Sequence, residues 1–163
     1  MDRYSIEYQY EIGINWYFLD RNDCIVHFNS AGAIVPDIIT ANAADNEVLN
    51  EYFAALSPYT SPVVNPFLTH YFDFTKLLTP PEPYVGYYAS RGLIDFDKQH
   101  PCSGSHDIAY FQVAVPTAPL TLQDVPDAIK NRLLKVRQPI RFHDFYQINA
   151  DYGPWATLFT NCF

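Results

Sequence analysis

Histidine, cysteine and aspartate side chains gather in one segment of the sequence. His100, Cys102 and His106 lie within seven residues, and Asp107 follows. Zinc takes three or four ligands of these types in a tetrahedral arrangement, at about 2.0–2.3 Å. The spacing matches no established set of ligand pairs, and the proline, glycine and serines between the ligands are typical of a polar loop. We therefore predict a loop over residues 100–107 and no bound metal.

Cys24 and His27 have the residue types of a nucleophile and its base. They fall in a predicted strand, where positions three apart point to opposite faces, so the two side chains are not expected to meet. Cys24 is instead predicted to be a small buried residue. The sequence also lacks the glycine-rich motifs that hold nucleotide phosphates and the Gly-x-Ser-x-Gly motif of hydrolases. It thus predicts a protein that is not an enzyme and uses no cofactor.

Length and composition predict a single domain over residues 1–163. Apolar residues make up 48% of the chain and charged residues 17%, far from the composition of disordered chains. The 13 tyrosines and 12 phenylalanines are expected mainly in the core. A small-ligand pocket lined by aromatic side chains remains an alternative.

Short runs rich in β-branched and aromatic residues predict the strands. They span residues 14–19, 24–28, 93–97 and 108–115. Turn-forming residues at 20–23 separate the first two runs, which therefore predict a hairpin. Pro116 is expected to end the last strand.

Apolar residues at helical spacing predict two longer helices, over residues 45–56 and 124–136. Asp45 and Asp124 are each placed to cap the helix that they begin. The second helix has a predicted buried stripe of Val125, Ile129 and Leu133.

Shorter elements are expected between these helices, because residues 57–83 contain six prolines. Residues 65–75 suit either a helix or a strand, and a short helix over 84–91 is predicted to end at Gly92. Together the elements predict an α+β fold, with a mixed or mainly antiparallel sheet packed against helices and covered on one side by the two longer ones.

Charge is distributed unevenly along the chain. The net charge is −8, and residues 1–60 contain nine acidic and only two basic residues. Such a region repels phosphate, so nucleic acid is not an expected partner, whereas a basic protein is. A role in solubility alone remains open. Basic residues on the outer face of the 124–136 helix are expected to be solvated, or to complement the acidic part within the fold or between copies.

The sequence also predicts where the protein resides. It has no apolar run of about 18 residues, so no membrane association is expected. Its first residues lack the basic start and apolar stretch of a secretory signal. Three scattered cysteines without paired spacing favour free thiols in a reducing compartment. These features predict a cytoplasmic protein.

Several short patterns within residues 14–126 occur in an order that can be compared with known families. They are Trp16 with Asp20, Ile25 with Phe28, Ser30-Ala31-Gly32, Gly92-Leu93 with Phe96-Asp97, Val113 to Pro116, and Pro119-Leu120 with Asp124-Val125-Pro126. In this order the sequence resembles a family of bacterial immunity proteins of polymorphic or contact-dependent toxin systems. It departs from the family at Asp23, where glycine is expected in the hairpin turn. The resemblance implies that the protein binds and neutralises a cognate toxin in the cytoplasm.

A toxin that cleaves nucleic acid needs a basic surface, which acidic side chains of an inhibitor would cover. The predicted contacts are Asp20 and Asp23 at the hairpin turn, and Asp45, Glu47 and Glu51 on the outer face of the first long helix. Two alternatives remain: a small-ligand-binding domain with an aromatic pocket and, ranked below it, a metal-dependent enzyme that uses the histidine-containing loop.

Overall fold

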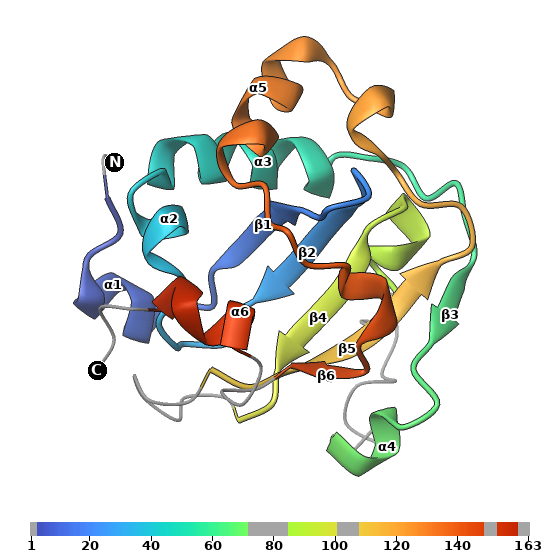
Figure 1. The fold of residues 1–163 in the computed structure, drawn as a ribbon, viewed down its shortest axis with the longest axis horizontal. Helices are drawn as coiled ribbons and strands as arrows, with labels where there is room; N and C mark the ends of the chain where they lie inside the picture. The colour runs from blue at the N-terminus through green and yellow to red at the C-terminus, as the bar shows by residue number, and fades with distance from the viewer. Residues whose placement is uncertain (1–2, 72–84, 101–107, 149–152, 160–163) are drawn as a thin grey trace.

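The fold is built on one six-stranded sheet (Figure 1). The computed structural model describes residues 3–71, 85–100, 108–148 and 153–159. The strands lie side by side in the order β1 (Asn15–Leu19), β2 (Ile25–Asn29), β4 (Ile94–Lys98), β5 (Tyr110–Pro116) and β3 (Pro62–Val64), and β6 (Gln147–Ile148) also pairs with β5. β2 and β4 run parallel, whereas the other pairs of these strands are antiparallel. The predicted α+β class with a mixed sheet is confirmed.

The predicted hairpin forms between β1 and β2. Trp16 pairs with Phe28, and Phe18 pairs with Val26. The turn holds Asp23 at a φ of 64°, in the left-handed region that favours glycine. Aspartate therefore takes the backbone conformation expected of glycine at this turn, and the hairpin keeps its register.

Because β2 and β4 are parallel, the chain between them must cross from one end of the sheet to the other. This connection contains α2 (Asp37–Thr40) and α3 (Ala43–Ala54). α3 is the helix predicted over residues 45–56, displaced by two residues. The prediction that Asp45 caps it is wrong, because Asn42 occupies the N-cap position and Asp45 lies within the first turn.

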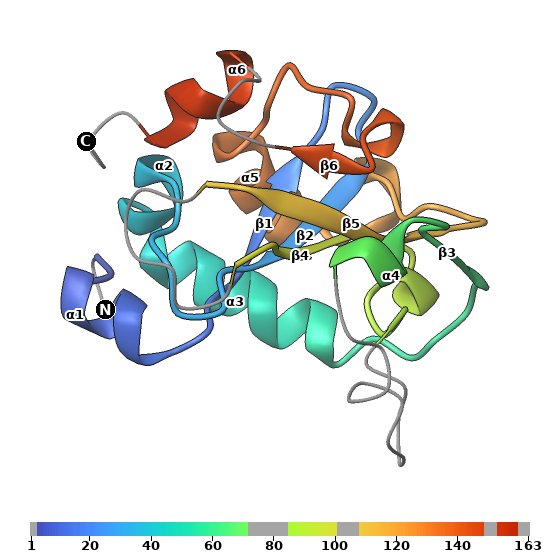
Figure 2. The same cartoon turned by 90° about the horizontal axis from the view of Figure 1, so that it is seen from below.

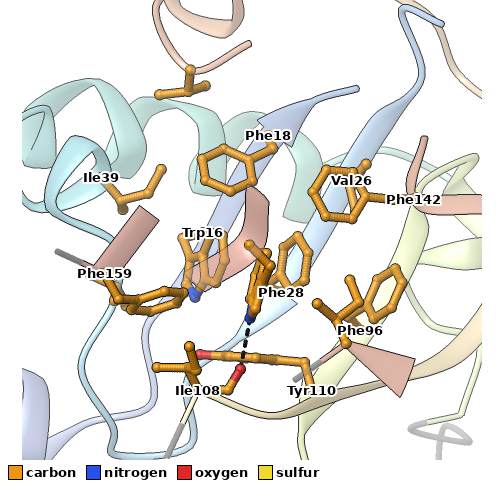
Figure 3. Packing of buried hydrophobic residues seen from close by; sticks show 14 of the residues in the cluster. Trp16, Phe18, Val26, Phe28, Ile39, Phe96, Ile108, Tyr110, Phe142 and Phe159 are labelled. Carbon is orange, nitrogen blue, oxygen red and sulfur yellow. Dashed lines mark hydrogen bonds between the residues drawn. The ribbon is translucent and has the colours of Figure 1, made fainter. Parts of the chain in front are cut away.

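An aromatic core covers one face of the sheet (Figure 3). The rings of Trp16 and Phe28 are stacked with their centroids 4.2 Å apart. Helix α6 (Gly153–Ala156), far away in sequence, adds Trp155, whose indole N–H donates a hydrogen bond of 2.8 Å to the carbonyl of Ile108. These rings belong to the core, as predicted.

Helices α3 and α5 (Asp127–Lys135) pack against the other face and the β1 edge of the sheet (Figures 1 and 2). Both contribute to a second apolar cluster together with residues of β1 and β2. This cluster includes Tyr17, Leu19, Ile25, Leu49, Phe53, Val125, Ile129 and Leu133. The apolar stripe predicted for the second long helix is therefore confirmed.

Helix α5 begins later than its sequence pattern predicts. The carboxylate of Asp124 forms a capping box with Thr121, the N-cap residue of the 3₁₀ helix η3 (Leu122–Asp124). α5 starts only after Pro126, which is its N-cap residue. The prediction that Asp124 caps the long helix is wrong, because the preceding turn already uses its carboxylate.

The proline-rich part forms the short elements β3 and α4 (Leu68–Tyr71). Strand β3 was not predicted, and the residues of the 65–75 prediction beyond Tyr71 lie outside the described part of the chain. The 3₁₀ helix η2 (Ala89–Arg91) ends as predicted at Gly92, whose φ is 89°. A side chain at this glycine would collide with Tyr59.

Two further 3₁₀ helices lie near the C-terminus. They are η4 (Phe142–Asp144) and η5 (Thr157–Phe159). Among the described residues, no helix has both the length and the apolar character needed to cross a membrane.

Candidate partner-binding surface

Asp20, predicted to contact a partner, is fully buried. Its Oδ1 accepts hydrogen bonds from the backbone N–H groups of Asn22 at 2.8 Å and Cys24 at 2.9 Å. Burial raises the pKa of this carboxyl above its ordinary value, and the two hydrogen bonds oppose that shift. Asp20 therefore organises the hairpin turn from inside the fold, and its carboxylate is not part of the surface.

Asp23 lies at the surface, but a cation of the same chain already pairs with it. The guanidinium of Arg137, just after α5, forms an ion pair with its Oδ1. Arg137 lies beside the end of β1, because its backbone forms a parallel bridge with Leu19. The ion pair thus ties the hairpin turn to the segment after α5.

Asp45 also forms ion pairs within the chain, with two basic side chains of α5. The Nζ of Lys135 lies 2.6 Å from one of its carboxylate oxygens, and the Nε of Arg132 lies 3.2 Å from the other. These contacts join the first turn of α3 to α5. The basic residues Arg132 and Lys135 therefore complement the acidic N-terminal part within the fold, which is one of the roles that the sequence left open.

Glu47 and Glu51 have no ion pair within the described part of the chain. Glu47 is partly buried and accepts a hydrogen bond of 2.7 Å from the hydroxyl of Tyr4. Burial is the main cause that raises the pKa of Tyr4 well above its ordinary value, so this hydroxyl remains a donor. Glu51, one turn further along α3, is exposed. The outer face of α3 therefore keeps a negative charge that no cation among the described residues neutralises.

Helix α1 (Ile6–Glu11) adds two acidic side chains that were not included in the predicted site. It begins at Ser5, whose side-chain oxygen accepts the backbone N–H of Tyr8 at 3.2 Å. Glu7 and Glu11 are exposed, and neither forms an ion pair within the residues described. Backbone and Ser5 hydrogen bonds lower the pKa of Glu7, so it stays charged. A serine before an apolar and acidic run was the signal for this helix.

A buried polar pair also escaped sequence reasoning. His27 of β2 and Asp95 of β4 meet on the face that α3 covers, with Nδ1 2.7 Å from Oδ1. The ring of Tyr88 stacks on the imidazole with the centroids 3.5 Å apart, and Nε2 lies 3.1 Å from Asn15 Oδ1. Burial raises the pKa of Asp95, which His27 partly offsets. Side-chain exposures of 3% and 7% show that the pair is buried, and it links the two parallel strands β2 and β4.

Cys24 and His27 lie on opposite faces of β2, as predicted. Cys24, the residue just before β2, packs against the aromatic core but is only partly buried, so the prediction that it is a buried residue is wrong; His27 faces Asp95. Only His100 of the loop predicted over residues 100–107 is described. The prediction that this loop binds no metal therefore lies outside the described residues. Among the described residues, no three histidine, cysteine or acidic side chains form a group that could hold a metal ion.

Comparisons with protein families, with curated proteins and with solved structures gave no match for this chain. The resemblance to bacterial immunity proteins is therefore untested and remains a prediction. What the structure adds is a division among the acidic residues: some are used inside the fold, and others remain on α1 and α3.

Proposed function

We propose that this protein acts by binding a basic protein partner, and that the partner is a cognate toxin that it neutralises in the cytoplasm. The main support is the set of acidic side chains that have no ion pair among the described residues. They are Glu7, Glu11, Glu47 and Glu51, on α1 and the outer face of α3. The resemblance to immunity proteins motivates the choice of a toxin as the partner.

Unpaired carboxylates at a surface favour this role for a physical reason. A toxin that cleaves nucleic acid must be positively charged where it meets phosphate. Acidic side chains attract such a surface over roughly one Debye length, about 8 Å at physiological salt, and so accelerate association. Once bound, the inhibitor occupies the surface that the substrate needs. Asp23 and Asp45 contribute less to this attraction, since Arg137, Arg132 and Lys135 neutralise them.

The decisive experiment tests a basic toxin domain found by sequencing the genes beside this one. The purified toxin should lose its activity on addition of an equimolar amount of the protein, and the association rate should fall steeply with rising salt. If the wild-type protein neither binds nor inhibits that toxin, the proposal is wrong.

A charge-reversal variant tests whether the acidic face is responsible. Glu51→Lys should slow association about 10-fold at low salt and weaken its salt dependence, because Glu51 is exposed and unpaired among the described residues. Asp127→Lys, on the exposed first turn of α5, changes the net charge equally and is the control. Equal slowing by the two variants would attribute the effect to net charge and remove α3 from the interface.

A further inference from the structure

The orientation of α1 is the reverse of what a helix packed on a core requires. Its single buried residue is Gln9, whereas Ile6 and Tyr10 are exposed by 58% and 42%. An amphipathic helix at a surface normally turns its apolar stripe toward the core. Here Ile6 and Tyr10 lie on the outward side, and of the apolar residues of α1 only Tyr8 packs against the core.

Polar contacts fix α1 in this orientation. The side-chain amide of Gln9 donates to the carbonyl of Tyr4 at 3.4 Å, and its oxygen accepts the backbone N–H of Val35 at 2.9 Å. The ring of Tyr8 stacks on that of Tyr4 with the centroids 5.7 Å apart. The helix therefore does not need Ile6 or Tyr10 to stay attached to the fold.

Two parallel stripes result on the outer face of α1. Ile6 and Tyr10 are four residues apart and form an apolar stripe, and Glu7 and Glu11 form an acidic stripe beside it. Glu47 continues the acidic region onto α3, because Tyr4, just before α1, donates to its carboxylate. An exposed apolar stripe bordered by like charges is typical of a surface that another protein covers.

We propose that α1 is the docking element for a basic amphipathic segment of the partner, an inference that rests on the proposed function. Apolar side chains of that segment cover Ile6 and Tyr10, and its lysines or arginines face Glu7 and Glu11. Tyr10 is the anchor, since tyrosine combines a large apolar ring with a hydroxyl and is common among residues that dominate binding.

A second copy of this chain suits the surface less well. Its most basic region is α5 and the segment after it, where Leu134 is exposed. However, Arg132, Lys135 and Arg137 already pair with Asp45 and Asp23 of the same chain. Charge complementarity therefore favours a different, basic protein over self-association.

Two synthetic peptides of equal length and charge test this chemistry on the whole chain. One is an amphipathic lysine–leucine helix, and the other has serine in place of leucine. At low salt the wild-type protein should bind the lysine–leucine peptide at least about 10-fold more tightly, because only that peptide covers the apolar stripe. Ile6→Ser and Tyr10→Ser should abolish the difference, whereas Leu134→Ser, an exposed leucine on α5, should preserve it. Circular dichroism checks that each variant is folded.

Three results obtained without the toxin would overturn the inference. These are equal binding of the two peptides, an equal loss with Leu134→Ser, or a dimer of the protein alone that Tyr10→Ser dissociates. The toxin assay separates this failure from that of the proposed function. If Tyr10→Ser inhibits the toxin as well as the wild type does, α1 is not the docking element although the protein is an inhibitor. If the wild type does not bind the toxin, the proposed function itself is wrong.

Discussion

Two groups of acidic side chains in the N-terminal part differ in what surrounds them. Asp23 and Asp45 lie opposite Arg137, Arg132 and Lys135, so they join the hairpin and α3 to the α5 region. The glutamates of α1 and the exposed end of α3 face no cation among the described residues. The same composition thus serves two purposes. Paired carboxylates hold elements of the fold together, and unpaired ones give the surface its negative field.

Asp95 extends this comparison to the interior, where pairing matters most. A buried carboxylate without a partner is costly, whereas a paired one is tolerated. The difference between the groups predicts how much the free energy of unfolding changes when an interaction of a carboxylate is removed. The change should be large for the buried pair and small at the α3–α5 contact. On the unpaired face, loss of the charge itself should have almost no effect on stability.

The largest expected effect follows from removing the partner of Asp95. His27→Ala should lower the free energy of unfolding by about 3–5 kcal/mol, because it leaves a buried carboxylate without its hydrogen bond and opens a space beneath Tyr88. Urea unfolding measures this change. The double variant His27→Leu with Asp95→Leu should recover much of the loss, since it removes the buried carboxylate together with its hydrogen-bond partner. A loss below about 1 kcal/mol in the single variant would contradict a structural role for the pair.

A smaller effect separates the paired and unpaired surface acids. Asp45→Asn should cost about 1 kcal/mol of unfolding free energy, because it removes the charge between Lys135 and Arg132. Glu51→Gln, on the same helix, should change the value by no more than about 0.5 kcal/mol. Raising the salt concentration should reduce the difference. Equal losses in the two variants would show that the ion pairs with α5 contribute nothing to stability.

The smallest expected effect is a pH dependence caused by Asp20. Burial raises its folded-state pKa above the value of about 3.9 in an unfolded chain. The folded protein therefore binds this proton more tightly, and the stabilisation is complete below the unfolded pKa and lost as the pH rises through the folded one. Relative to Asp20→Asn, the wild type should gain stability as the pH falls from neutral toward 4. Urea unfolding at several pH values tests the sign, and a relative loss on acidification would contradict it.

Local patterns in the sequence predicted much of the fold. The hairpin, the strands β4 and β5 and the helices α3 and α5 all appear where alternating or helical spacing of apolar residues indicated them. The short elements α1 and β3 were not predicted, and two helix starts were predicted wrongly. Asp45 and Asp124 both have a residue type suited to capping, yet α3 already begins at its N-cap Asn42, and Asp124 closes a separate turn. Capping depends on where the helix begins and on which partner reaches the side chain, and sequence spacing reveals neither.

The sequence predicted only part of the candidate partner-binding surface, for a similar reason. Net charge and its concentration in residues 1–60 follow from composition alone. Whether each carboxylate is available depends on distant residues: Asp23 and Arg137 are 114 positions apart, and Asp45 and Lys135 are 90 apart. Asp20 accepts hydrogen bonds from its own turn, and the backbone of Phe142, more than 100 positions away, is a further donor to its carboxylate.

By itself, the sequence determined an acidic α+β domain with an aromatic core, since these properties follow from composition and from the local spacing of apolar residues. Only the tertiary structure decided which acids remain on the surface and that α1 turns Ile6 and Tyr10 outward. Ion pairing and burial arise from contacts between segments far apart in the chain, and no local pattern contains that information.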